Sequence, residues 1–340
     1  MTSEVKNKIE SIVFAVAIII ILAFLAIGCD VCDSGVGSNA GDMIYFSAVS
    51  LNGDSTAVYT IMPNGRDTRE IAPEGMIFSP PSKSGKIVYL SAGAIVLANI
   101  DGSEKEIIYD GNVYIPGEPI ISPDGGIVAF KGGDGRLLLL KPGFTLISLT
   151  GILAGNTIPA FSYSGKYLAF LENNGMNHIL KVIDTDNPDR VILSRTYPHQ
   201  GDKKIRISSS GTANEICFSW DNSNSGNISH ISLPSGDETR LEDPAIGAKS
   251  PFFMDDKGMI GFVSNDNSLW QTTLGNNFNR LIAGDPGIEI NNPEYNRFNQ
   301  KIIYCKSNES QNYGVLYSFD INTKTENILF ANAFSGYWRE

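Results

Sequence analysis

A short turn motif recurs along this chain at nearly constant spacing, and such a repeat restricts the possible folds more than any single motif does. The motif is a serine followed three residues later by glycine, and then by a run of strand-forming residues. Its clearest copies, Ser82–Gly85, Ser122–Gly125 and Ser162–Gly165, place their glycines 40 residues apart. Weaker copies occupy Ser208–Gly211, Met254–Lys257 and Asn296–Asn299. Because glycine adopts a positive φ at no steric cost, each clear copy predicts a tight turn between two antiparallel strands.

A second series of turns falls between these motifs and predicts another hairpin in each repeat. Asn64-Gly65 and Asp101-Gly102 are strong hairpin signals, with strand-forming residues on both sides. Seven segments have this form: 58–71, 95–109, 137–149, 179–193, 230–242, 269–282 and 316–330. The two series together give about four strands per repeat, which is the size of a propeller blade. We therefore predict an all-β fold, a β-propeller over residues 42–340.

The number of blades follows from comparing the two series. Seven hairpins are present, but the serine-centred inner strand occurs only six times, because the first hairpin set begins at Ile44 without one. Residues Ala331–Trp338 follow the last hairpin and can supply the missing strand. We expect seven four-stranded blades, closed by pairing of the C-terminal strand with the N-terminal blade, which removes an open sheet edge. Six or eight blades would mean that a degenerate repeat had been misread.

Proline accompanies several inner strands, and we expect it as their first residue, where no ladder N–H is needed: Pro119, Pro159, Pro251 and Pro293.

Two repeats carry a more specific resemblance. Residues 119–130 (PIISPDGGIVAF) and 159–170 (PAFSYSGKYLAF) resemble the repeat of TolB-like propellers, which is also seen in the propeller of prolyl oligopeptidase-type peptidases. Weaker copies extend the resemblance across about 42–338. TolB carries an α/β domain ahead of its propeller, whereas here only about ten residues separate the apolar segment from the first strand. The resemblance therefore implies the propeller without that domain, and it implies no particular function.

The first 28 residues form a membrane-targeting segment, either a signal peptide or a membrane anchor. Lys6 and Lys8 precede an uncharged apolar run, Ile12–Ile27. Leu25–Cys29 resembles a bacterial lipobox, although Ala26 stands where leucine is preferred. Two alternatives stay open: cleavage followed by lipidation of Cys29, or an uncleaved helical anchor. Either one, followed by a linker over 29–41, places the propeller outside the cytoplasmic membrane, in the periplasm or on the cell surface.

Charge and motifs limit the function. A net charge of −11 disfavours nucleic-acid partners. The chain has no Gly-x-Ser-x-Gly, no Walker-type loop and no His-Glu-x-x-His, and its three histidines lie in different repeats. Asp184–Asp189 resembles the start of a calcium loop but lacks its glycine and distal glutamate, so we interpret it as a turn. We predict no catalytic residue, metal site or cofactor. Cys217 and Cys305 lie in apolar strands, which indicates buried thiols.

Three functional hypotheses follow from these observations. The first is a noncatalytic, membrane-tethered binding or scaffold module, monomeric, with a protein, peptide or envelope polymer as its ligand. The second is an enzyme whose site is assembled from blade loops at the mouth of a central funnel. The third is a structural subunit of a membrane complex. Trp220, Trp270 and Trp338 either line the funnel or pack between blades, and packing is the favoured interpretation.

Overall fold

The computed structural model separates Met1–Gly41 from a compact unit, Asp42–Glu340, and it describes most of the second. The described ranges are 43–50, 55–110, 117–141, 143, 145–149, 157–175, 177–198, 207–210, 212–220, 227–241, 247–254, 258–308 and 313–338. The predicted targeting segment, the linker and Cys29 lie outside them. Across these ranges the chain forms strands and turns, and none of its segments is a helix with the length and apolarity needed to span a membrane.

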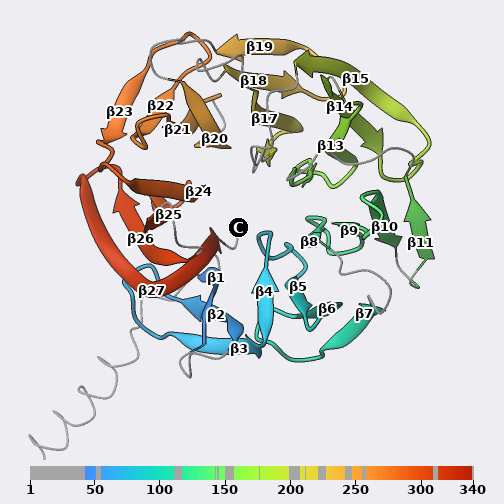
Figure 1. Ribbon diagram of the computed structural model, residues 1–340, viewed down its shortest axis with the longest axis horizontal. Helices are drawn as coiled ribbons and strands as arrows, with labels where there is room; N and C mark the ends of the chain where they lie inside the picture. Colours follow the sequence, from blue (N-terminus) through green and yellow to red (C-terminus); the bar gives the residue numbers. More distant parts are fainter. Residues whose placement is uncertain are drawn as a thin grey trace, which may run out of the picture. The chain divides into compact units, whose positions relative to one another are not determined.

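Five four-stranded antiparallel sheets follow one another along the chain and surround a common centre (Figure 1). The first contains β4 (Gly75–Ile77), β5 (Lys86–Ser91), β6 (Ala94–Asn99) and β7 (Glu106–Asp110), and the second β8 (Gly117–Ile121), β9 (Val128–Lys131), β10 (Leu137–Lys141) and β11 (Thr145–Ser148). The third contains β12 (Ala160–Phe161), β13 (Tyr167–Asn173), β14 (Asn177–Asp184) and β15 (Val191–Pro198). The fourth contains β16 (Ser208–Ser209), β17 (Glu215–Trp220), β18 (Asn227–Ser232) and β19 (Glu238–Leu241), and the fifth β20 (Ala248–Phe253), β21 (Ile260–Ser264), β22 (Leu269–Thr272) and β23 (Asn279–Ile282). Each sheet begins with an inner strand, and the seven predicted hairpins are all formed.

The remaining strands form one seven-stranded sheet, in the order β24-β25-β26-β27-β1-β2-β3. Its strands are β24 (Ile288–Asn296), β25 (Lys301–Asn308), β26 (Gly314–Asp320), β27 (Thr325–Trp338), β1 (Ile44–Val49), β2 (Thr56–Ile61) and β3 (Arg69–Pro73). Strand β27 pairs with β26 through Thr325–Ala333 and with β1 through Ala333–Trp338. Asn332 lies at the register shift just before Ala333, with a φ of 59°, a left-handed conformation that asparagine tolerates better than most residues. The final residues of β27 run toward the centre of the ring (Figure 1).

The serines of the repeat hold the turns that the sequence predicts. The Oγ atoms of Ser82, Ser122 and Ser162 each accept a backbone N–H at or just before the start of the next strand, from Lys86, Ile127 and Tyr167 at 2.9, 2.9 and 3.1 Å. Gly85, Gly125 and Gly165 have φ values of 80°, 78° and 73°, as expected. We call these turns, each between an inner strand and the next strand, the first turns. The face of the ring that carries them is the turn face.

The prolines of the inner strands differ from the prediction at three positions. Pro119, Pro251 and Pro293 lie inside β8, β20 and β24, where the register shifts by a bulge. The residue before each proline has a positive φ: Glu118, Ser250 and Asn292. A bulge leaves a residue unpaired, so proline's missing N–H removes no ladder bond there. Pro159 directly precedes β12, which agrees with the expectation.

The hydrophobic core lies between sheets and not at one centre. Six of the seven core clusters among the described residues join two successive sheets, such as Val88 and Ile95 packed with Val128 and Phe130. The seventh lies within the seven-stranded sheet, where Phe46 and Tyr59 of β1 and β2 pack with Leu316 of β26. Burial of a side chain of this size stabilises the fold by about 1.5–3 kcal/mol. The order of the sheets round the ring is therefore held by apolar packing.

Candidate functional site

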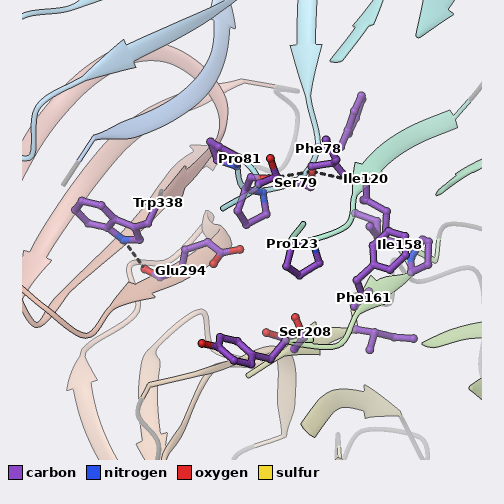
Figure 2. Close-up of a pocket in the computed structure, with 18 of the residues that line it drawn as sticks. Phe78, Ser79, Pro81, Ile120, Pro123, Ile158, Phe161, Ser208, Glu294 and Trp338 are labelled. Atoms are coloured by element: carbon purple, nitrogen blue, oxygen red, sulfur yellow. Dashed lines mark hydrogen bonds between the residues drawn. The ribbon is translucent and has the colours of Figure 1, made fainter. Parts of the chain in front are cut away.

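A pocket of about 150 Å³ opens among the inner strands at the turn face. Its walls come from four successive sheets and from the ends of β24 and β27. Figure 2 shows Trp338 and Glu294 on one side of the pocket, and Ile120, Ile158 and Phe161 on the other. Because the inner strands converge on the centre, residues up to 260 positions apart, from Phe78 to Trp338, share this small space. Ligand sites of β-propellers and other closed folds commonly lie where loops converge in this way.

The wall is slightly more apolar than polar and contains several prolines. Phe78, Ile120, Ile158 and Phe161 provide aliphatic and aromatic surface, and further contributions come from Pro80, Pro81, Pro123, Pro159 and Ile207. Proline has no backbone N–H, so these positions place few backbone donors on the wall. An apolar cavity of about this volume holds a group the size of benzene. The pocket therefore fits one branched or aromatic side chain, and is too small for a folded segment.

Hydroxyl groups form the polar portion of the wall, and one of them ties two inner strands together. The Oγ atom of Ser79 accepts the backbone N–H of Ile121 at 3.3 Å, which links the end of β4 to β8. Ser47 links β1 to β4 in the same way, because its Oγ atom accepts the backbone N–H of Ile77 at 2.8 Å. Other serines of the wall, Ser208, Ser209 and Ser210, come from β16 and its turn. The wall thus offers short polar groups that accept or donate without carrying charge.

One ammonium group and one carboxylate complete the lining. The Nζ atom of Lys83 lies 3.1 Å from the centre of the Tyr163 ring and 3.4 Å from the Tyr163 carbonyl oxygen. These residues belong to the first turns of the first and third sheets, so their contact crosses the turn at Pro123. Elsewhere on the wall, the Trp338 indole N–H donates to the Glu294 carbonyl oxygen at 3.3 Å, and the Glu294 side chain is directed into the pocket (Figure 2). The wall therefore carries one positive and one negative side chain.

A second polar group lies between the third and fourth sheets, away from the pocket. The Glu238 carboxylate accepts hydrogen bonds from the Tyr197 hydroxyl at 3.0 Å and the Ser229 hydroxyl at 2.6 Å, and pairs with Arg195 at 2.8 Å. Burial alone raises the pKa of Glu238, but hydrogen bonds from Ser229, Arg240 and Tyr197 outweigh it, so the pKa is lowered. Burial, reinforced by the neighbouring Glu238 charge, raises the pKa of Tyr197 to about 12. This group joins two sheets and does not belong to the pocket wall.

The three tryptophans differ in their surroundings, and both roles considered from the sequence, lining the centre and packing between sheets, occur. Trp338 lines the pocket and is also buried in the core. Trp220 packs between sheets and donates to Ser229 Oγ at 2.8 Å, and Trp270 on β22 donates to Ser264 Oγ at 3.1 Å. Packing therefore describes Trp220 and Trp270, and both descriptions hold for Trp338. The sequence prediction missed Lys83, Tyr163 and Glu294, although each stands in or beside a first turn and could have been found from its position in the repeat.

The other residues considered from the sequence lie in ordinary structural positions. His178 on β14 and His230 on β18 are buried, and His199 falls outside the described ranges. Asp184 caps its own turn by accepting the Asp186 N–H at 3.0 Å. Within the described ranges no group of acidic, histidine or cysteine side chains has the arrangement of a metal site. Cys217 and Cys305 are buried as predicted, and burial raises the pKa of the Cys305 thiol to about 12.

Comparison with known proteins identifies the fold. No family model matches the chain, and no curated protein matches it. Among solved structures, TolB from Acinetobacter baumannii is 16% identical, with a TM-score of 0.55 over 90% of this chain and 68% of its own. A quinonprotein alcohol dehydrogenase-like protein from Bacteroides thetaiotaomicron is 9% identical, with a TM-score of 0.60 over 89% and 78%. Dipeptidyl peptidase 4 from Porphyromonas gingivalis is 12% identical, with a TM-score of 0.53 over 87% and 52%. The chain therefore has a TolB-like β-propeller fold, and these identities establish nothing about function.

Proposed function

We propose that this chain is a noncatalytic binding module, tethered on the extracytoplasmic side of a membrane, whose central pocket takes a side chain of a partner polypeptide. The observation that carries the proposal is the composition of the pocket wall. Its surface combines apolar side chains with hydroxyls and two charged side chains, and its size suits one anchoring side chain. Such buried anchors dominate the affinity of protein interfaces, while the surrounding contacts exclude water. An envelope polymer, the other ligand considered from the sequence, would offer this wall mostly polar groups.

We infer further that the ring has seven blades closed by its C-terminal strand. Division of the seven-stranded sheet at Asn332 gives two four-stranded units that share β27. Together with the five separate sheets this makes seven units. A core cluster bridges each successive pair of units, including the pair joined by β27 and β1. Closure of this kind explains why the chain's last strand helps to form the pocket.

The tether in this proposal comes from the N-terminal sequence. Lipidated Cys29 or an uncleaved anchor over residues 1–28 would hold the propeller in the periplasm or at the cell surface. The hypothesis of an enzyme with a loop-built site predicts several acidic or histidine side chains converging at the pocket. Glu294 is the carboxylate that the described wall contributes there. This composition supports binding over acid–base catalysis as the role of the pocket.

Crosslinking in living cells tests the proposal. Tagged full-length protein would be crosslinked, extracted in detergent and analysed by mass spectrometry for co-purifying proteins. Phe78→Ala removes an aromatic group from the pocket wall, and Ile328→Ala is the matched control, because Ile328 is 67% exposed on the outer strand β27. We expect one reproducible partner whose recovery falls at least tenfold with Phe78→Ala and stays unchanged with Ile328→Ala, a loss of about 1.4 kcal/mol or more. Equal recovery with both variants, or no specific partner, would refute it.

A further inference from the structure

The two charged side chains among the described residues of the pocket wall, Lys83 and Glu294, differ in exposure. Lys83 is exposed, and its ammonium group lies 3.1 Å from the centre of the Tyr163 ring and 3.4 Å from the Tyr163 carbonyl oxygen. Glu294 is half-buried, and its side chain is directed into the pocket (Figure 2). Water and salt screen an exposed charge more strongly than a half-buried one. A ligand group inside the pocket therefore meets mainly the negative field of Glu294.

Aromatic residues accompany this carboxylate. The Trp338 indole N–H donates to the Glu294 carbonyl oxygen at 3.3 Å, which holds the backbone of Glu294 beside the indole. Tyr295, the next residue along β24, also lines the pocket. A cation is attracted both by a carboxylate and by the face of an aromatic ring. Of the two common cationic side chains, arginine suits this region better, because its planar guanidinium is weakly hydrated, stacks on rings and pairs with a carboxylate through two hydrogen bonds.

The hydrogen-bonding groups of the wall also favour a ligand that donates. Four residues of the wall are prolines, which have no backbone N–H but keep a carbonyl oxygen: Pro80, Pro81, Pro123 and Pro159. The Glu294 carboxylate is an acceptor as well. A guanidinium carries five N–H donors and no acceptor, so it complements a wall that is rich in acceptors and poor in backbone donors.

We propose that the side chain bound by the central pocket is an arginine of the partner polypeptide, with its guanidinium at Glu294 and its methylene stem against the apolar side chains of the wall. This inference rests on the proposed function, because it names the residue that fills the same pocket. The cavity of about 150 Å³ fits a side chain with a flat, branched end. The net charge of −11 also attracts basic segments to the protein before they dock.

Three small amides test the charge preference on the unmodified protein. The probes are the methylamides of N-acetyl-arginine, of N-acetyl-citrulline and of N-acetyl-glutamate. Citrulline has nearly the shape of arginine but ends in an uncharged urea group. Dissociation constants for full-length protein in detergent would be measured by saturation-transfer NMR, with empty micelles as the background. We expect the arginine amide to bind at least tenfold more tightly than the citrulline amide, and the glutamate amide to bind most weakly.

Two matched variants locate the charge that is responsible. Glu294→Gln keeps the shape of the side chain and the carbonyl oxygen that Trp338 contacts, so we expect it to abolish the tenfold difference between the arginine and citrulline amides. Glu104→Gln removes an exposed carboxylate that pairs with Lys86 and does not line the pocket, and we expect the difference to persist. A tenfold difference that survives Glu294→Gln would overturn the inference, because the guanidinium would then bind elsewhere.

The remaining outcomes separate this inference from the proposed function. Equal binding of the arginine and citrulline amides, lost in Phe78→Ala, would overturn the preference for arginine and leave the pocket as a side-chain site. Tighter binding of the glutamate amide would also overturn it and would assign the preference to Lys83. If none of the three amides binds, the inference fails, whereas the proposed function fails only if crosslinking in cells finds no partner that depends on Phe78.

Discussion

Trp338 lies opposite Ile44 in the register between β27 and β1, and its indole N–H also donates to the Glu294 carbonyl oxygen at 3.3 Å. One side chain therefore contacts the N-terminal strand, a neighbouring inner strand and the pocket. It is 2% exposed and belongs to the core cluster that joins the beginning and the end of the folded chain. The same residue lies in the pocket wall and in the pairing of β27 with β1.

Replacement of this tryptophan should destabilise the whole ring. We expect Trp338→Ala to lower the free energy of unfolding by about 3–5 kcal/mol, because it leaves a cavity in the core and removes the hydrogen bond to Glu294. Trp270→Ala is the matched control, since Trp270 is half-buried on β22, and we expect about half that loss. Urea unfolding followed by circular dichroism gives both values. Equal losses would show that Trp338 has no special role in joining β27 to β1.

The Glu238 group should contribute more than a surface ion pair does. Glu238→Gln keeps the shape of the side chain but removes the charge that Arg195, Tyr197 and Ser229 contact. We expect a loss of about 2–3 kcal/mol, the range for hydrogen bonds to a charged group. The matched change, Glu104→Gln, breaks an exposed pair with Lys86 and should cost less than about 1 kcal/mol. Comparable losses in urea unfolding would contradict a structural role for the group.

The same group predicts how stability changes with pH. The pKa of Glu238 is lowered on folding, so its contribution is present above the unfolded value of about 4.3 and is lost as pH falls through the folded value. Free energies of unfolding measured between neutral pH and about pH 3 should therefore converge for wild type and Glu238→Gln. A difference that stays constant across this range would contradict the lowered pKa.

Tyr197 should make the free energy of unfolding depend on pH in alkaline solution, where stability falls as pH rises. Its pKa rises to about 12 on folding, from about 10 in the unfolded chain. Its contribution is therefore complete below about pH 10 and is lost as pH rises toward 12. Tyr197→Phe has no proton to lose, so the stability difference between this variant and wild type should shrink between about pH 10 and 12. An unchanged difference would show that the hydroxyl titrates normally.

A pair of glycines tests how closely the hairpins pack. Gly102 and Gly143 both lie in turns before outer strands, with φ values of 81° and 77°. A Cβ atom at Gly102 would lie 2.3 Å from the Ile71 carbonyl oxygen of the neighbouring sheet, whereas nothing lies within 4 Å at Gly143. Alanine at Gly143 should cost about 1–2 kcal/mol through its left-handed backbone alone. Gly102→Ala should cost clearly more, because backbone must move, and an equal loss in urea unfolding would be evidence against this contact.

The sequence predicts the local features of this fold well, because their causes are local. Ser122 and Gly125 form their turn through atoms a few residues apart, so the motif itself contains the information. Pro119 could not be placed in its bulge, because the bulge is defined by the partner strand and not by the residues around the proline. Repeat spacing predicts where strands lie, but not how their register shifts.

Contacts between sheets could not be predicted from the sequence, for a different reason. Tyr197 and Glu238 lie 41 residues apart, and their hydrogen bond depends on how two sheets face each other. Lys83 and Tyr163 are 80 residues apart and meet across an intervening turn. No local pattern marks such pairs, since each member alone is typical of an exposed turn or outer strand. The pocket forms because the inner strands converge at the centre. Its residues could have been indicated only by their positions in the repeat.

The most direct test of the central claim is photocrosslinking from the pocket in living cells. A photoreactive amino acid would replace Tyr163, which lines the pocket, and in a matched strain Leu146, which is 46% exposed on the outer strand β11. If the pocket is the binding site, one protein adduct should form from position 163 and be absent from position 146. The same adduct from both positions, or from position 146 alone, would contradict a binding role for the central pocket.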